Sequence, residues 1–231
     1  MGITKSKEKI LLLIALIFGL ASISLIWLGD PEYVYAITRE DQEIETMTVI
    51  FYLIGFIMAL VAFFSNRKLL VALIWAVIIF IFLGEETSWF QRIFNYSVPA
   101  IEDVNAQKEF NFHNLDIFQG GSVIEDGFSL SVLLKSQNLF RLGFFGYFLV
   151  VPLLMYIPKL KKIANKVGYV QPSKLFIIVL LVVFVLSFAL APMVEFNVKM
   201  SIAETREMLY SFFILIYVIL YIWMTRFNFK K

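Results

Sequence analysis

Six apolar stretches of 16 to 20 residues divide this sequence, and they restrict its possible folds more than any other feature. They cover residues 10–28, 46–65, 69–88, 142–157, 175–192 and 208–224. A helix needs about 20 apolar residues to cross the hydrocarbon core of a bilayer, where only a helix or a closed barrel satisfies its own backbone. The sequence therefore predicts an all-α integral membrane protein, in which residues 1–231 form one bundle of six transmembrane helices.

The composition agrees with this class, because 60% of the residues are hydrophobic and 25 of the 231 are Phe. The chain has no cysteine, which excludes disulfides and thiolate metal sites. Its basic residues flank the apolar stretches and form no basic face, so nothing indicates nucleic-acid binding. The first stretch is longer than the apolar region of a typical signal peptide and no clean cleavage site follows it, so we expect it to be retained.

The charged residues predict the orientation of the bundle. If the N-terminus is cytoplasmic and each stretch crosses once, the cytoplasmic segments hold 13 of the 20 basic residues and a single acid, Glu8. The basic residues are Lys5, Lys7, Lys9, Arg67, Lys68, Lys159, Lys161, Lys162, Lys166, Lys174, Arg226, Lys230 and Lys231. Lysine and arginine accumulate on the cytoplasmic side of membrane proteins. We therefore expect a multi-pass protein of the plasma (inner) membrane with both termini in the cytoplasm.

The third stretch carries two adjacent carboxyl groups at its outer end. Its apolar run, residues 69–83, has 15 residues, which span about 22 Å of helix against roughly 30 Å of hydrocarbon core. We expect the helix to continue through Glu85, Glu86 and Ser88 before it leaves the membrane. Both carboxyls then lie at or just below the outer interface, where charges are costly and usually functional.

A helix extended in this way places Glu85, Ser88, Trp89 and Arg92 on one face. This arrangement predicts an ion pair between Glu85 and Arg92, with Glu86 pointing elsewhere, into the bundle. The alternative is that Glu85 and Glu86 are simply solvated carboxylates at a helix end.

A long connection, residues 89–141, follows on the outer side, and it is far longer than the usual link between packed helices. It is rich in aromatic residues, which a solvated tether is not. Ser122 and Glu125 form a capping-box pattern before an apolar run that ends at Leu134. We expect a structured connection with a short helix at the outer interface that covers a cavity. Ser201 and Glu204 form a similar pattern before the sixth stretch.

The connection also contains the only histidine. Glu109 and His113 are four residues apart and share a face if that segment is helical. Such a pair supplies two ligands to one metal ion, or a base and the group that orients it. The alternative is that His113 is a hydrogen-bonded structural residue.

These residues define a candidate site at the outer end of the bundle. Its predicted catalytic residues are Glu85, Glu86, Arg92, Glu109 and His113, and its predicted metal ligands are Glu85, Glu86, Glu109 and His113. Carboxylates with one histidine suit Mg²⁺, Mn²⁺, Ca²⁺ or iron better than zinc. Other polar residues on the same side are Glu45, Gln91, Asn105, Gln107, Asn111, Asn114, Glu125, Asp126, Glu195, Glu204 and Arg206.

Two resemblances rest on this region. The run from Gly84 to Arg92 (GEETSWFQR), followed by NAQKEFNFHN at 105–114, resembles a GEExSWxQR…NxQxExNxHN pattern in a family of polytopic bacterial membrane proteins without an assigned activity. The Glu85–Glu86 pair is also loosely similar to the Glu-Glu motif of CAAX-type intramembrane proteases. Here five residues separate Glu86 from Arg92, where that motif has three, and the second histidine of those enzymes is missing.

Two classes of function remain open. The first is a membrane-embedded hydrolase or transferase that acts on a lipid or lipid-linked substrate at the outer leaflet. Glu85 and Glu86 would then bind a divalent cation or act as base, and Arg92 would hold an anionic group. The second is a carrier, channel or subunit of a membrane complex, in which the acids bind a cation or fix helix packing.

Overall fold

The computed structural model describes residues 2–39, 42–118, 130–193 and 196–228. Within these ranges every regular element is helical, apart from an isolated antiparallel bridge between Asn105 and Leu115. The predicted all-α class is therefore confirmed. The long helices are α1 (Gly2–Leu28), α3 (Glu43–Ser65), α4 (Leu70–Glu86), α12 (Lys174–Leu190) and α13 (Phe196–Asn228). The fourth apolar stretch lies in a nearly continuous run of α9 (Ser136–Phe145), the π-helical η3 (Gly146–Val150) and α10 (Val151–Leu154).

Short helices connect these long ones. They are α2 (Pro31–Thr38), η1 (Ser88–Phe90), α5 (Gln91–Phe94), α6 (Pro99–Glu102), η2 (Asp116–Phe118), α8 (Leu130–Leu134), α11 (Pro158–Lys166) and η4 (Ala191–Met193). The Asp30 side chain caps α2 by accepting the backbone N–H groups of Glu32 and Tyr33.

Four helices of the described chain are long and apolar enough to cross a membrane: Lys5–Leu28, Glu43–Ser65, Ser136–Leu154 and Ser201–Thr225. The other two predicted stretches correspond to α4 and α12, which are as apolar but have only 17 residues each. A multi-pass membrane protein follows from the four long helices alone.

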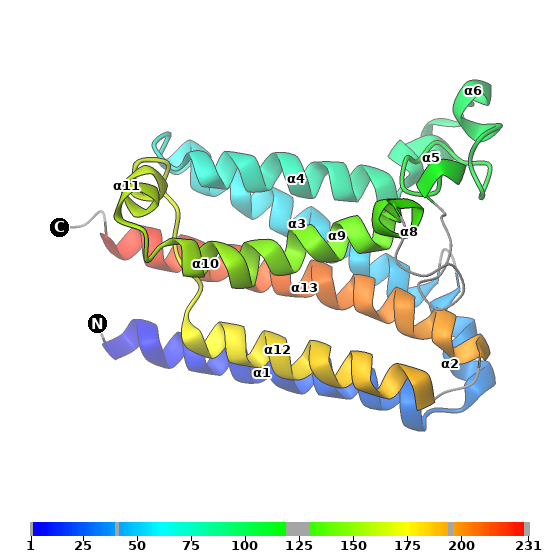
Figure 1. The fold of residues 1–231 in the computed structure, drawn as a ribbon, viewed down its shortest axis with the longest axis horizontal. Coiled ribbons are helices and arrows are strands. Elements are labelled where there is room, and N and C mark those ends of the chain that lie inside the picture. The colour runs from blue at the N-terminus through cyan, green and yellow to red at the C-terminus, as the bar shows by residue number, and fades with distance from the viewer. Residues whose placement is uncertain (1, 40–41, 119–129, 194–195, 229–231) are drawn as a thin grey trace.

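Helix α13 is the centre of the bundle. In its apolar window 83% of the residues are buried, against 28% in α1 and in α3. It packs against α1, α2, α3 and α12, while α3 and α4 form an antiparallel hairpin (Figure 1). Aromatic rings fill the space around α13, where Phe148, Phe176, Phe184, Phe213 and Tyr217 are almost fully buried. The outward faces of α1, α3, α4 and α12 carry exposed aliphatic side chains, as lipid-facing helices do.

The two ends of the bundle differ in charge. The start of α1, the end of α13 and the lysine-rich α11 lie at one end, which we call the terminal end (Figure 1). Helices α2, α5, α6 and α8 lie at the opposite end, which we call the connection end. Among the described residues, the segments that the sequence assigns to the two sides of the membrane thus lie at opposite ends of the fold.

Several predicted boundaries are wrong. Helix α4 stops at Glu86 and does not reach Ser88. Helix α13 begins at Phe196, so Ser201 is an interior residue and not a cap: its hydroxyl accepts a hydrogen bond from Thr38 at 2.7 Å. Helix α9 begins at Ser136, which places Arg141 inside it. The capping-box pattern at Ser122 and Glu125 lies outside the described residues.

Candidate functional site

The end of α4 is a left-handed turn made without glycine. Ser88, Trp89 and Phe90 have positive φ angles of 46°, 52° and 65°. Each such residue costs roughly 1–2 kcal/mol, and strain of this kind persists only where surrounding contacts enforce it. Here the turn folds the indole of Trp89 back onto Gly84, where a Cβ would lie only 2.9 Å from the ring. The predicted helical face with Glu85, Ser88, Trp89 and Arg92 is therefore wrong.

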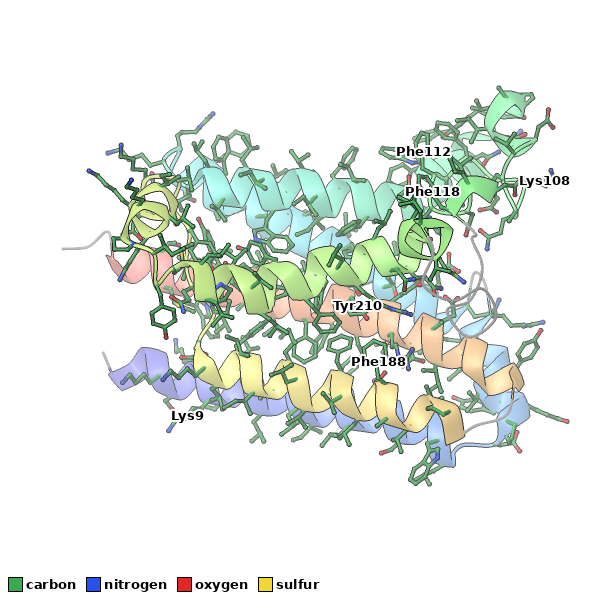
Figure 2. The ribbon with its side chains drawn as sticks, in the orientation of Figure 1. Lys9, Lys108, Phe112, Phe118, Phe188 and Tyr210 are labelled. Carbon is green, nitrogen blue, oxygen red and sulfur yellow. The ribbon has the colours of Figure 1, made fainter. Side chains whose placement is uncertain are left out.

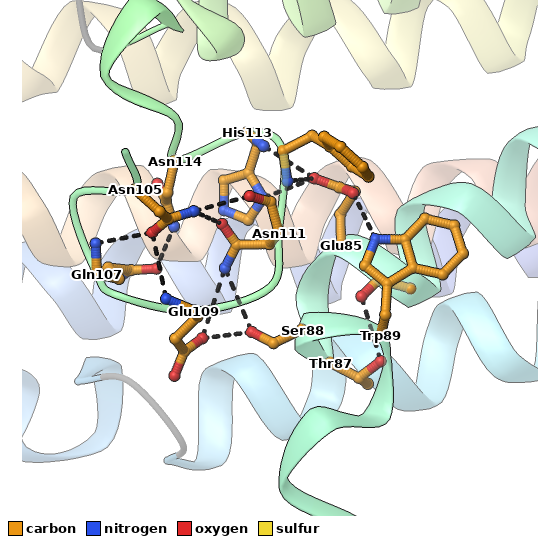
Figure 3. A network of polar contacts seen from close by, with 12 residues as sticks. Glu85, Thr87, Ser88, Trp89, Asn105, Gln107, Glu109, Asn111, His113 and Asn114 are labelled. Atoms are coloured by element: carbon orange, nitrogen blue, oxygen red, sulfur yellow. Dashed lines mark hydrogen bonds and ion pairs between the residues drawn. The ribbon is translucent and has the colours of Figure 1, made fainter. Parts of the chain in front are cut away.

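Glu85 fastens the connection to α4. Its Oε2 accepts the backbone N–H groups of Phe112 and His113, each at 2.8 Å, and lies 3.2 Å from the His113 ring Nδ1 (Figure 3). Its Oε1 accepts the indole N–H of Trp89 at 2.7 Å. Both carboxylate oxygens are engaged, so Glu85 ties three segments together. The Arg92 side chain lies outside the described residues, so the predicted ion pair between Glu85 and Arg92 stays a prediction.

A second set of bonds closes the loop from 105 to 114. The Ser88 hydroxyl donates to the Glu109 carboxylate, and the Asn111 amide donates to the Ser88 hydroxyl at 3.2 Å (Figure 3). Asn105 is buried and donates to the Asn111 carbonyl at 2.7 Å. The Asn114 amide donates to Gln107. The segment is not helical, so the prediction that Glu109 and His113 share a helix face is wrong.

A third set of bonds holds the outer turn. Gln91 accepts the Phe110 N–H at 2.7 Å and donates to Glu102 at 2.6 Å. Glu102 also accepts the hydroxyl of Ser97 and the N–H of Val98. These hydrogen bonds, that of Ser97 foremost, lower the pKa of the Glu102 carboxyl. The polar residues of the 84–114 pattern thus mostly bind one another.

The predicted metal ligands do not form one ligand set. Glu85 contacts His113, Glu109 contacts Ser88, and Glu86 faces other carboxyls inside the bundle. In the described part of the chain, no three histidine, aspartate or glutamate side chains are grouped to hold a metal ion. Glu125, Asp126 and Glu195 lie outside the described residues.

A cavity of about 960 Å³ lies beneath the connection. Helices α3, α4, α9 and α13 form its walls, and the segment with Glu109, Asn111 and His113 lines its connection end. Because α4 rises toward the connection end and α13 descends from it, the charged residues line one end and the apolar residues the other. The carboxyl side chains at the charged end are Glu45, Glu85, Glu86, Glu109, Glu204 and Glu207; deeper in the bundle the walls are Trp75, Ile78, Phe144, Tyr147 and Ile214.

Four aromatic rings separate these two parts. The ring of Tyr52 on α3 is tilted against that of Phe82 on α4, with centroids 5.6 Å apart, and the Phe82 centroid lies 4.9 Å from that of Phe140 on α9. Phe140 lies 5.0 Å from Tyr210 of α13. All four rings line the cavity, one from each wall helix. We call Tyr52, Phe82, Phe140 and Tyr210 the aromatic belt.

Two carboxyl groups stand directly above this belt. Glu86 is one turn beyond Phe82 on α4, and Glu207 is one turn before Tyr210 on α13. Glu86 interacts electrostatically with the carboxyls of Glu207, Glu204, Glu45 and Glu85. Glu207 interacts in the same way with the positive charges of His113 and Arg141. Among the described residues neither Glu86 nor Glu207 makes a hydrogen bond, although both lie inside the bundle. The prediction that Glu86 points into the bundle is confirmed.

Four residues of the cavity are not among the predicted site residues: Tyr52, Arg141, Glu207 and Tyr210. Glu207 directly precedes the sixth apolar stretch and is three residues after Glu204, a spacing that puts both on one side of a helix. That spacing was an available signal. The participation of Arg141 depends on α9 beginning earlier than expected.

Arg206, a predicted site residue, fastens α13 to α12. Its Nε donates to the Ser187 hydroxyl and its terminal nitrogen donates to the Ser187 carbonyl, both at 2.7 Å. The guanidinium also lies over the ring of Phe188, 4.2 Å from its centroid. Figure 2 shows Phe188 and Tyr210 in this part of the bundle. Arg206 lines the cavity, but its donors serve this helix–helix contact.

The cavity has an apolar opening on the side of the bundle. Ile81 of α4 and Leu139 of α9 both line it, and 43% and 38% of their surfaces are exposed. Gly143 of α9 also lines it, and a Cβ there would meet nothing within 4 Å. The cavity therefore opens between α4 and α9, on the lateral surface that a membrane protein presents to lipid.

Comparisons of this chain with protein-family models, with curated proteins and with solved structures find no match. The resemblance of residues 84–114 to a membrane-protein family stays a prediction.

Proposed function

We propose that this chain is a six-span membrane protein that binds a lipid or lipid-linked substrate in the cavity and acts on it as a hydrolase or transferase. The observation that carries this proposal is the polarity of the cavity, which is charged at the connection end, aromatic in the middle and apolar toward the bundle centre. An amphiphile entering between α4 and α9 would place its head group beside the carboxyls and its chain below the aromatic belt.

The proposed topology has both termini in the cytoplasm and the connection outside. The separation of basic and acidic segments to opposite ends supports it, since lysine and arginine accumulate on the cytoplasmic side. Helices α4 and α12 would complete the six spans. Their 17 residues rise about 25 Å, a length that a bilayer accommodates by local thinning. The head-group end of the cavity then opens at the outer leaflet.

In this proposal Glu86 and Glu207 are the acid–base groups. They line the cavity from two different helices, α4 and α13, and their charges interact. Paired carboxyls in a water-poor site are a recurring arrangement for proton transfer to and from a substrate. Arg141 lines the cavity, and its charge acts on Glu207. Glu85 and His113 are positioning residues, because they hold the connection over the cavity.

The second candidate is a carrier, and one observation favours it. Below the cavity, the Trp75 indole donates to the Tyr147 hydroxyl at 3.0 Å, which lies 2.8 Å from the Tyr217 hydroxyl. Tyr217 in turn donates to the Val170 carbonyl, in the loop after α11 at the terminal end. Polar groups thus continue from the cavity floor toward the opposite end of the bundle.

The test is to incubate the purified protein in nanodiscs of bacterial inner-membrane lipid and to follow the lipids by mass spectrometry. The enzyme proposal predicts a product whose formation falls at least about 100-fold in Glu86→Gln and in Glu207→Gln, as for a lost acid–base group. Gly143→Leu should block the cavity and also abolish turnover, whereas Gly146→Leu should not, because Gly146 does not line the cavity and has open space around its Cβ. Bound lipid without any product would favour the carrier.

A further inference from the structure

From the charge and the unpartnered groups of the cavity, we infer that its substrate has a head group that carries an ammonium. This inference rests on the proposed function and names its substrate class. The charged residues that line the cavity are six glutamates against three cations, Lys135, Arg141 and Arg206, so carboxyls outnumber cations by three. A head group that brings a positive charge offsets this excess, whereas a purely anionic one increases it.

The hydrogen bonds of the lining residues show which charged groups already have partners and which do not. Arg206 already donates two hydrogen bonds to Ser187, and Arg141 donates to Gln137 and Asn138 of its own helix. Glu86 has no hydrogen-bond partner among the described residues and is surrounded by other carboxyls. Ionising a buried carboxyl is costly unless a cation or donors meet it, and no described residue donates a hydrogen bond to Glu86. A cationic group of the ligand would supply the partner that Glu86 lacks.

The aromatic belt completes the receptor for an ammonium group. Phe82 and Tyr210 stand one turn below Glu86 and Glu207, and the four belt rings follow one another at 4.9 to 5.6 Å between centroids. Aromatic faces attract ammonium groups, and carboxylates beside them add direct charge pairing. Lys135 lies at the rim of the cavity and could meet the phosphate of a zwitterionic head group.

The direct experiment compares three probes with the same dodecyl chain: dodecyltrimethylammonium, dodecylphosphocholine and dodecyl phosphate. Each is titrated into the full-length protein in a neutral detergent, and bound probe is counted by native mass spectrometry. We expect both ammonium probes to bind with a Kd about 10-fold or more below that of dodecyl phosphate, the effect of one buried charge-assisted contact. The preference should fall to about 2-fold or less in the Glu86→Gln/Glu207→Gln variant.

Two controls make the outcome specific. Glu43→Gln removes a carboxyl from the first turn of α3, at the same end of the bundle but outside the cavity, and should keep the full preference. Gly143→Leu should weaken all three probes, whereas Gly146→Leu should weaken none.

The results separate a failure of the ammonium inference from a failure of the proposed function. Binding of dodecyl phosphate as tight as that of the ammonium probes, with all three weakened by Gly143→Leu, overturns the ammonium inference and leaves the cavity as a lipid site. Binding that Gly143→Leu does not affect overturns the proposed function itself. If the double variant does not fold, the comparison of the three probes on the wild type and on Gly143→Leu still decides between these results.

Discussion

Glu85 holds His113 at two points: its Oε2 accepts the backbone N–H at 2.8 Å and lies 3.2 Å from the ring Nδ1. The two residues are 28 positions apart, so this contact closes the connection onto the end of α4. Because the Glu85 carboxylate accepts several N–H groups, it has a structural role and is not available as a base.

The first prediction concerns this fastening. Glu85→Ala removes the acceptor of the Phe112 and His113 N–H groups and of the Trp89 indole. Hydrogen bonds to a charged group contribute about 1.5–3 kcal/mol each and are not additive, so we expect the connection to open more easily by roughly 2–4 kcal/mol. Hydrogen exchange should show faster exchange at residues 105–118 while α13 stays protected. Unchanged exchange would show that Glu85 does not hold the connection.

Gly84 gives the second prediction. A methyl group there would lie 2.9 Å from the Trp89 ring, which Glu85 holds in place. Gly84→Ala should therefore lower stability by about 1–2 kcal/mol, since overpacking exceeds the gain in helix propensity. Gly143→Ala, where a Cβ meets nothing, should be neutral or stabilising by up to about 1 kcal/mol. Thermal unfolding in neutral detergent compares the two, and equal effects would contradict the close packing at Gly84.

The left-handed backbone of Lys108 gives a prediction of opposite sign. Its φ angle is 60° and its side chain is exposed, with a single bond to the Asp103 carbonyl at 3.0 Å. Lys108→Gly removes the steric cost of this conformation and should stabilise the connection by about 0.5–1 kcal/mol. Lys108→Ala keeps that cost and should not stabilise it. Proteolysis of the connection measures both, and greater protection in the alanine variant would contradict the assignment.

Glu102 gives a pH prediction outside the membrane spans. Because Ser97 and Val98 donate to its carboxylate and lower its pKa, its contribution to the turn is present above the ordinary glutamate value, near 4.3, and is lost as the pH falls through the lowered value. The Val98 amide should exchange faster in acid by more than general catalysis explains. Glu102→Gln should remove this excess, and an excess that persists there would have another origin.

The sequence predicted the helices well and the turns between them poorly. Each of the six apolar stretches is mostly helical in the structure, because an apolar run of this length is recognised whichever segments pack beside it. The end of α4 could not be predicted in the same way. No glycine marks the turn at Ser88, Trp89 and Phe90, and contacts from residues more than 20 positions away enforce it.

The candidate site shows the same division. The positions of Glu45, Glu86 and Glu204 at the ends of apolar stretches predict that they lie at the same end of the bundle. All three line the cavity. Which carboxyls face one another depends on the rotation of α13 against α4, and that rotation is set by side-chain packing across the bundle. Glu207 was therefore missed, although it lines the same cavity as Glu86 and interacts with it. Glu85 and His113, two of the predicted metal ligands, bind each other instead.

The two adjacent glutamates should therefore behave in opposite ways. Glu85→Gln should weaken the connection, whereas Glu86→Gln removes a buried carboxyl without a hydrogen-bond partner and should keep or raise the thermal stability. Glu86→Gln should nevertheless abolish turnover, because the proposed function needs this carboxyl to transfer a proton to or from the substrate. Metal content, measured by mass spectrometry on wild type and the Glu85→Gln/Glu86→Gln variant, shows whether an ion depends on this pair. Loss of stability in Glu86→Gln with full activity would reverse the roles assigned to the two residues.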